Sequence, residues 1–100
     1  MSGQRQTRRV TVSVDVVLGA EGAHYFAQTG DLSQTGLFLR TTRAFPIGTR
    51  LRLVFGQPPA LPRVEAEGVV RWCSAGEGVG IEFTRVTPED KDNISRFLGV

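Results

Sequence analysis

Arginine is the residue type in this chain that most clearly points to ligand binding. Twelve of its 100 residues are basic, and Lys91 is the only lysine, so the other eleven are arginines. Three of them, Arg5, Arg8 and Arg9, lie close together ahead of the first alternating apolar segment. A planar guanidinium binds phosphate through forked donors and stacks on flat rings. A GC-rich genome would also raise the number of arginines, so their number alone is weak evidence for a ligand. The clustering of Arg5, Arg8 and Arg9 is stronger evidence.

A second group of chemically useful residues, Asp31, Ser33 and Gly36, forms the pattern DxSxxG. The composition makes this pattern rare by chance, whereas RxxxR, here Arg5 to Arg9, is common by chance in a chain so rich in arginine. Asp31 and Ser33 could bind a ligand, or they could hydrogen-bond nearby backbone and cap their own turn. The arginines could equally form a solvated tail. The order of the patterns adds weight, since RxxxR precedes the first predicted strand and DxSxxG separates the second from the third.

Alternation of apolar and polar residues predicts the strands that position these groups. Valine or leucine at every second position of residues 10–18 is typical of a half-buried β-strand. Similar segments follow, separated by turn-forming residues. The predicted strands cover residues 10–18, 23–29, 37–41, 50–55, 63–72 and 79–83. In the fifth, Trp72 shares the apolar phase of Val64 and Val70, which favours a place in the core or at the barrel rim over a ligand platform.

The period of the pattern changes near the C-terminus. Thr87 supplies a hydroxyl cap, Pro88 suits the first helical position, and acidic residues follow at the positive end of the helix dipole. Ile94 and Leu98 fall at helical spacing, and Gly99 ends the pattern. The prediction is an all-β fold, a small six-stranded antiparallel β-barrel with a C-terminal α-helix. Its expected parts are a flexible arginine tail over residues 1–9, a barrel over about 10–84 and a helix over about 88–98.

The two patterns, in this order and placement, resemble the ligand signature of the PilZ domain family, in which RxxxR precedes [D/N]xSxxG. Segments 36–39, 45–49 and 78–83 are similar to the family's turn and closing-strand patterns, so the resemblance covers about Arg5 to Leu98. One departure precedes the first motif arginine, where many members carry another arginine and this chain has Gln4. Arg8, inside the motif, could compensate.

The resemblance implies a module that binds the bacterial second messenger cyclic di-GMP. One arginine fork matches guanine O6 and N7, and an aspartate can accept from guanine N1–H and N2–H. A second arginine can pair with phosphate or stack on the base. Ser33 would donate to a phosphate or base edge, and Gly36 would let the backbone come close. The implied ligand-binding residues are Arg5, Arg8, Arg9, Asp31, Ser33 and Gly36.

The expected function is that of a stand-alone PilZ-type domain that signals to an unidentified protein partner when the ligand orders its arginine tail. The alternative is a nucleotide-independent PilZ interaction domain of motility or pilus assembly, which would not need to keep both patterns. A barrel that binds RNA or single-stranded DNA is disfavoured, because most aromatic residues fall in the apolar phase of the strands rather than along a basic groove. One or two cyclic di-GMP molecules per domain, and a monomer or a homodimer, are both compatible with the sequence.

The composition does not favour an enzyme, a metalloprotein or a membrane-inserted protein. His24 is the only histidine and Cys73 the only cysteine, so no nucleophile–base pair or multi-cysteine metal site is indicated. No apolar run approaches the roughly 20 residues that span a bilayer. The N-terminus lacks the apolar core of a secretory signal. The expectation is a cytoplasmic binding protein with no metal, no nucleic acid and no cofactor besides its ligand.

Overall fold

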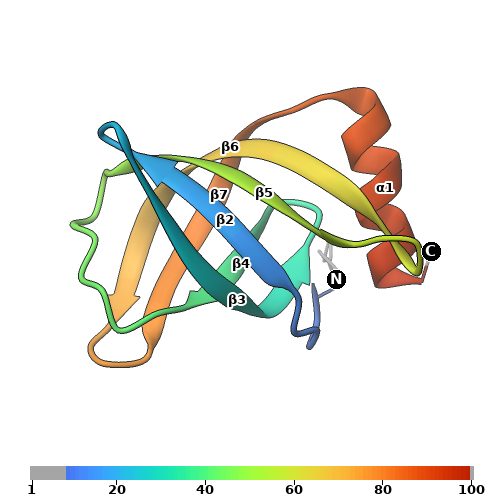
Figure 1. Ribbon diagram of the computed structural model, residues 1–100. Coiled ribbons are helices and arrows are strands. Elements are labelled where there is room, and N and C mark those ends of the chain that lie inside the picture. The colour runs from blue at the N-terminus through green and yellow to red at the C-terminus, as the bar shows by residue number, and fades with distance from the viewer. Residues whose placement is uncertain (1–8, 100) are drawn as a thin grey trace, which may run out of the picture.

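The computed structural model describes residues 9–99, which form antiparallel strands followed by one helix (Figure 1). The elements are β1 (Arg9–Val10), β2 (Asp15–Ala20), β3 (Ala23–Ser33), β4 (Gly36–Arg40), β5 (Arg50–Gln57), β6 (Leu61–Ser74), β7 (Gly78–Val86) and α1 (Pro88–Leu98). The strand order is β1-β3-β2-β5-β6-β7-β4, and pairing of β3 with β4 closes the sheet. Strands β2 to β7 thus form the predicted six-stranded barrel, and the short β1 is added beside β3.

Helix α1 covers one end of the barrel, on the right in Figure 1. Ile94 and Leu98 are buried in the same core as the strand side chains. The ring centroids of Phe97 and Phe55 lie 5.8 Å apart, which joins the helix to β5. Burial of this apolar helix face is the main reason for the helix to dock here.

The ends of α1 are those that the sequence predicts. The Thr87 hydroxyl accepts a hydrogen bond from the Asp90 amide, with Pro88 at the first helical position. Gly99 ends the helix in a left-handed conformation with φ of 76°. Within the described residues 9–99, no helix combines the length and hydropathy required to cross a membrane.

The continuous strand predicted for residues 10–18 is wrong, because the structure divides it into β1 and β2. Val14, Val16 and Leu18 are nevertheless buried, so the predicted alternation of buried and exposed side chains is present. The fully buried Thr29 on β3 explains the break. Its Oγ1 accepts from the Val14 amide at 3.0 Å and donates to the Val12 carbonyl. A side chain thus replaces the backbone partners that a regular strand would have used.

Replacing Thr29 by valine, which has nearly the same shape, tests this explanation. Valine cannot accept from the Val14 amide, and a buried donor without a partner costs about 1–3 kcal/mol. We expect the free energy of unfolding, measured by urea denaturation, to fall by that amount. The control is Thr11→Val at an exposed position of the same segment, with a change within about 0.5 kcal/mol. Equal stability of the two variants would show that the Thr29 hydroxyl is dispensable.

Strand β3 continues past its predicted end at Thr29 to Ser33. A register shift between Thr29 and Asp31 in the pairing with β4 makes Gly30 the extra residue of a β-bulge. The bulge lets Leu32 remain in the core while Asp31 turns outward. The expectation that the DxSxxG pattern lies between strands is therefore wrong for Asp31 and Ser33, which belong to β3.

Candidate functional site

The two sequence patterns meet on the outer surface at β1 and β3. Arg9 is the register partner of Ser33, which brings its guanidinium to the carboxylate of Asp31. Arg9 Nη1 donates to Asp31 Oδ1, and the Phe38 amide donates to the same oxygen at 3.2 Å. No group within residues 9–99 donates to Asp31 Oδ2. One carboxylate oxygen and the remaining guanidinium donors are therefore available to a ligand.

This ion pair is only partly shielded from water. The side chain of Arg9 is 50% exposed and that of Asp31 is 31% exposed. Pairs with such exposure contribute about 0–1 kcal/mol to folding. The two side chains can thus change partners on binding at little cost to the fold.

Ser33 lies beneath this surface. Its side chain is fully buried, its Oγ accepts from the Thr35 amide at 3.2 Å, and it donates to the Gly36 carbonyl at 3.3 Å. These bonds hold the turn between β3 and β4. Gln34 in the same turn donates to Ser95 Oγ of α1 at 2.7 Å. Ser33 is thus placed to position the turn, which is the alternative that the sequence left open.

Gly36 allows β4 to approach β7. A Cβ at this position would lie 2.1 Å from the carbonyl oxygen of Ile81 on β7. Glycine is therefore needed at position 36 because β4 and β7 pack closely there. Gly36 also lines the recess described below. Two further predicted residues, Arg5 and Arg8, lie outside the described residues.

Trp72 is the site residue whose position the alternation pattern mispredicted. A register shift between Val70 and Trp72 in the β6–β7 pairing makes Arg71 an extra residue and turns Trp72 to the outer face. The indole is 51% exposed and stacks on Phe38, with ring centroids 5.3 Å apart and planes at 24°. The indole lies over Gly80, where a Cβ would lie 2.0 Å from Trp72 Nε1. A glycine inside a strand often marks such a close approach, and Gly80 was the available signal.

These side chains form one row across four strands. Asp31 pairs in register with Phe38, Phe38 with Gly80, and Gly80 with Trp72. Together with Arg9 they line an open recess of about 450 Å³, a volume within the range of small-molecule sites. The recess combines an aromatic surface with two ion pairs, Arg9–Asp31 and Arg71–Glu82. Such a combination suits a flat, anionic ligand that carries both hydrogen-bond donors and acceptors.

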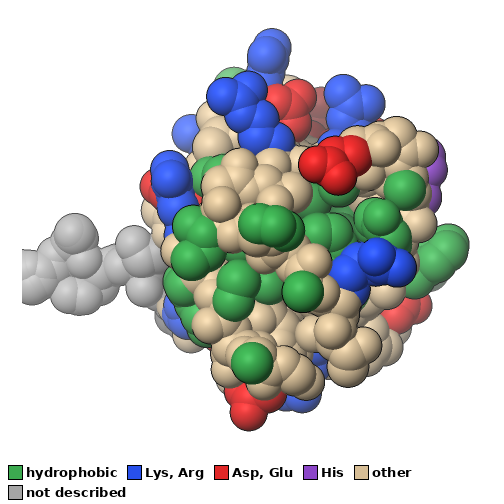
Figure 2. Space-filling view, turned by 90° about the vertical axis from the view of Figure 1, so that its left-hand side faces the viewer, with side chains coloured by type: hydrophobic (Ala, Val, Ile, Leu, Met, Phe, Trp, Pro, Cys, Tyr) green, Lys and Arg blue, Asp and Glu red, His purple; other side chains and the backbone are tan. Residues whose placement is uncertain are grey.

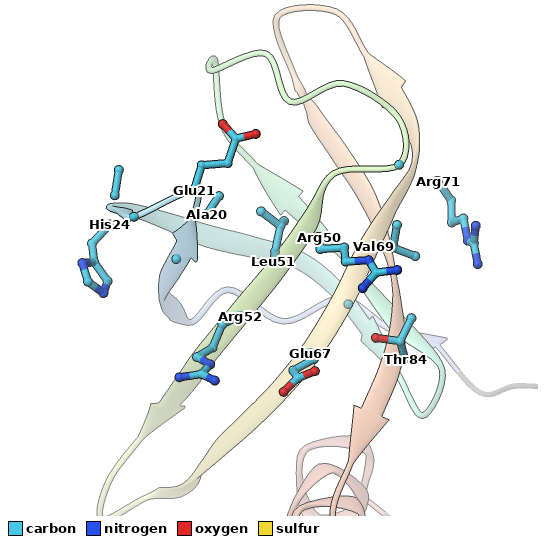
Figure 3. Close-up of a pocket in the computed structure, with 15 residues that line it drawn as sticks. Ala20, Glu21, His24, Arg50, Leu51, Arg52, Glu67, Val69, Arg71 and Thr84 are labelled. Atoms are coloured by element: carbon cyan, nitrogen blue, oxygen red, sulfur yellow. The ribbon is translucent and has the colours of Figure 1, made fainter.

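A larger recess of about 910 Å³ lies beside the β2–β3 hairpin (Figure 3). Arg50 and Arg52 of β5 and Glu67 of β6 contribute charges, and Arg52 is the register partner of Glu67. Its described lining residues include no Phe, Tyr or Trp and none of the residues from the two sequence patterns. The smaller recess is therefore the candidate site.

Comparisons with known proteins agree with the β-barrel fold described above. The sequence model of the PilZ domain family matches residues 3–99. Curated proteins provide no match. The structure is similar to that of the Bacillus subtilis inhibitor of motility (MotI/DgrA), with 20% identity and a TM-score of 0.83 over 97% of this chain and 50% of that chain. This chain thus spans half the length of that protein.

Two other solved structures are also similar. The PilZ domain of CeSA from a cellulose-synthesizing bacterium is 14% identical with a TM-score of 0.69, over 91% of this chain and 94% of that chain. The Borreliella burgdorferi PlzA protein, solved in complex with c-di-GMP, is 18% identical with a TM-score of 0.68, over 95% of this chain and 41% of that chain. At these identities the similarity shows a common fold.

Proposed function

Since the chain belongs to the PilZ domain family, which includes cyclic di-GMP receptors, we propose that it binds cyclic di-GMP in the recess between Arg9, Asp31 and Trp72. The observation that carries the proposal is the half-exposed Arg9–Asp31 pair in one row with an exposed indole. Its groups match guanine and phosphate one by one. We further propose a binding module of the cytoplasm rather than an enzyme.

Asp31, Arg9 and Trp72 would each have a partner on the nucleotide. Asp31 Oδ2 would accept from guanine N1–H and N2–H, while the remaining donors of Arg9 would reach a phosphate or the O6 and N7 edge. The indole of Trp72, supported by Phe38, would stack on a base. Arg5 and Arg8 would add phosphate contacts from the tail. Ser33 and Gly36 would act mainly by positioning the turn and strand that carry these groups.

Titration calorimetry with cyclic di-GMP, with GTP and linear pGpG as controls, tests the proposal. We expect saturable heat for the cyclic dinucleotide only, and the titration also gives the number of bound molecules. The absence of heat and of a thermal shift at high ligand concentration would favour the nucleotide-independent interaction domain.

Signalling to a protein partner would follow from ordering of the N-terminal tail. A ligand that bridges Arg9 with Arg5 and Arg8 would hold this segment against the barrel and change the surface offered to the partner. Amide hydrogen exchange of residues 4–9 is expected to slow at saturating ligand. Exchange at an unchanged rate would rule out the ordering step while leaving the binding site intact.

The role of Trp72 can be measured directly, because it is the only tryptophan in the chain. We expect cyclic di-GMP to change its fluorescence. Loss of base stacking costs about 1–3 kcal/mol, so Trp72→Ala should weaken binding by about 10- to 100-fold. Trp72→Phe, which keeps a flat ring, is the matched control and should lose less. Equal affinity of wild type and Trp72→Ala would remove the indole from the site.

A further inference from the structure

One edge of β3 is open over residues 23–27. On one side, β2 pairs with β3 as far as Ala23. On the other side, the pairing with β4 ends at Gln28, the partner of Arg40. The chain then leaves β3, as the Thr41 amide donates to the Glu77 carbonyl in the β6–β7 turn. Within residues 9–99, no backbone hydrogen bond joins residues 41–46 to residues 23–27.

The geometry of an antiparallel ladder determines which backbone groups face this open edge. The Thr29 amide donates to the Val14 carbonyl on the β2 side. Every second residue of β3 repeats this direction, so Ala27 and Tyr25 also point towards β2. The intervening residues, His24 and Phe26, must point their N–H and C=O groups to the open side. An edge with unpaired donors and acceptors is a template for an added strand.

There is room for an added strand at this edge. Residues 24–26 of β3 and residues 41–44 line an open recess of about 760 Å³. Phe26 is 83% exposed beside it, which makes it the most exposed large hydrophobic residue of residues 9–99. Figure 2 faces this end of the barrel and shows hydrophobic side chains interspersed with basic and acidic ones. An apolar side chain of an incoming strand could cover Phe26.

The charges around the recess are basic. The Arg43 guanidinium lies 4.2 Å from the centroid of the Tyr25 ring. Arg43 is the charged side chain that lines the recess; it is exposed and forms no salt bridge with any described residue. No described acidic residue lines the recess, and the exposed His24 points away from the barrel (Figure 3). Charge complementarity therefore favours an acidic occupant.

We propose that this edge binds an extended acidic segment of a partner protein as an added strand beside β3. The backbone of His24 and Phe26 supplies the hydrogen bonds, the Phe26 ring packs on an apolar side chain, and Arg43 pairs with a carboxylate. The edge is separate from the recess of Arg9, Asp31 and Trp72. The proposal does not depend on nucleotide binding.

The test uses Phe26→Pro, which removes one outward N–H without touching the bonds to β2, because proline is tolerated where the N–H faces solvent. The probe is a blocked heptapeptide of alternating glutamate and valine, titrated into the full chain and followed by amide NMR. We expect shifts centred on residues 23–27 and 41–44, and a loss of affinity of at least about tenfold in Phe26→Pro. Phe26→Ala, which keeps the N–H, is the matched control and should lose less.

Arg43→Glu gives a second variant on the exposed surface, and we expect it to weaken binding of the acidic peptide to a similar extent. A lysine–valine peptide should bind the wild-type chain at least about tenfold more weakly. Equal binding of the two peptides, shifts outside this edge, no saturation at about 1 mM peptide, or pairing of two copies of the chain through this edge would each overturn the proposal.

Discussion

Replacing Arg9 by alanine is expected to weaken cyclic di-GMP binding strongly while leaving the barrel folded. The variant removes the charged donor that the structure places beside Asp31 at the mouth of the recess. Hydrogen bonds to charged groups contribute about 1.5–3 kcal/mol each. Loss of two such bonds to the nucleotide corresponds to about a 100-fold or greater weakening. Titration calorimetry of the variant against the wild-type chain measures the change.

The stability of the Arg9→Ala variant separates binding from folding. Because the Arg9–Asp31 pair is partly solvent-exposed, its removal should lower the free energy of unfolding by less than about 1 kcal/mol. Arg63→Ala is the matched control, since Arg63 also forms an exposed ion pair, with Glu65 at 3.3 Å, and does not line the recess. Arg63→Ala should bind cyclic di-GMP normally. Equal affinities of the two variants would show that Arg9 is not a ligand contact.

Replacing Gly36 by alanine is expected to cause one of the largest losses of stability that a single methyl group can produce in this chain. The new Cβ would meet the Ile81 carbonyl oxygen at 2.1 Å, so β4 and β7 would have to separate. Overpacking costs about 1–3 kcal/mol and occasionally more, and so close an approach to backbone belongs at the upper end of that range. A loss of this size is a large part of the 5–15 kcal/mol that typically stabilises a domain. Urea denaturation measures this loss.

Gly19→Ala in β2 is the matched control for Gly36→Ala. A Cβ at position 19 would lie 3.7 Å from the nearest side-chain atom, His24 Cδ2, which is an ordinary contact. The free energy of unfolding should change by no more than about 0.5 kcal/mol. If Gly36→Ala retained wild-type stability but lost nucleotide affinity, Gly36 would serve the ligand directly rather than the pairing of β4 with β7.

Strand β3 contributes to both proposed binding surfaces. Its C-terminal half carries Asp31 in the nucleotide recess, and its N-terminal half carries the open edge at His24 and Phe26. The bulge at Gly30 lies between the two. The variants at Arg9 and Phe26 therefore test two surfaces that share one strand but no binding residue.

The sequence by itself determined the fold class, the helix and the chemistry of the predicted site. Strict alternation identified the buried valines of the first segment, and the Thr87 cap and Gly99 defined the ends of α1. Such features are local, because the period of apolar residues and the conformational preferences of caps act within a few residues. Arg9 and Asp31 were also identified from their patterns, and the structure brings them into contact.

Only the tertiary structure decided the features that depend on pairing between distant strands. The bulge at Arg71 moved Trp72 from the predicted inner face to the recess, and the bulge at Gly30 kept Asp31 and Ser33 within β3. A single extra residue moves every residue after it to the opposite face of the sheet. The sequence of one strand does not specify which residues of the neighbouring strand it pairs with, so the positions of the bulges could not be predicted. For the same reason the open edge at Phe26 became visible only when the end of the β3–β4 pairing was known.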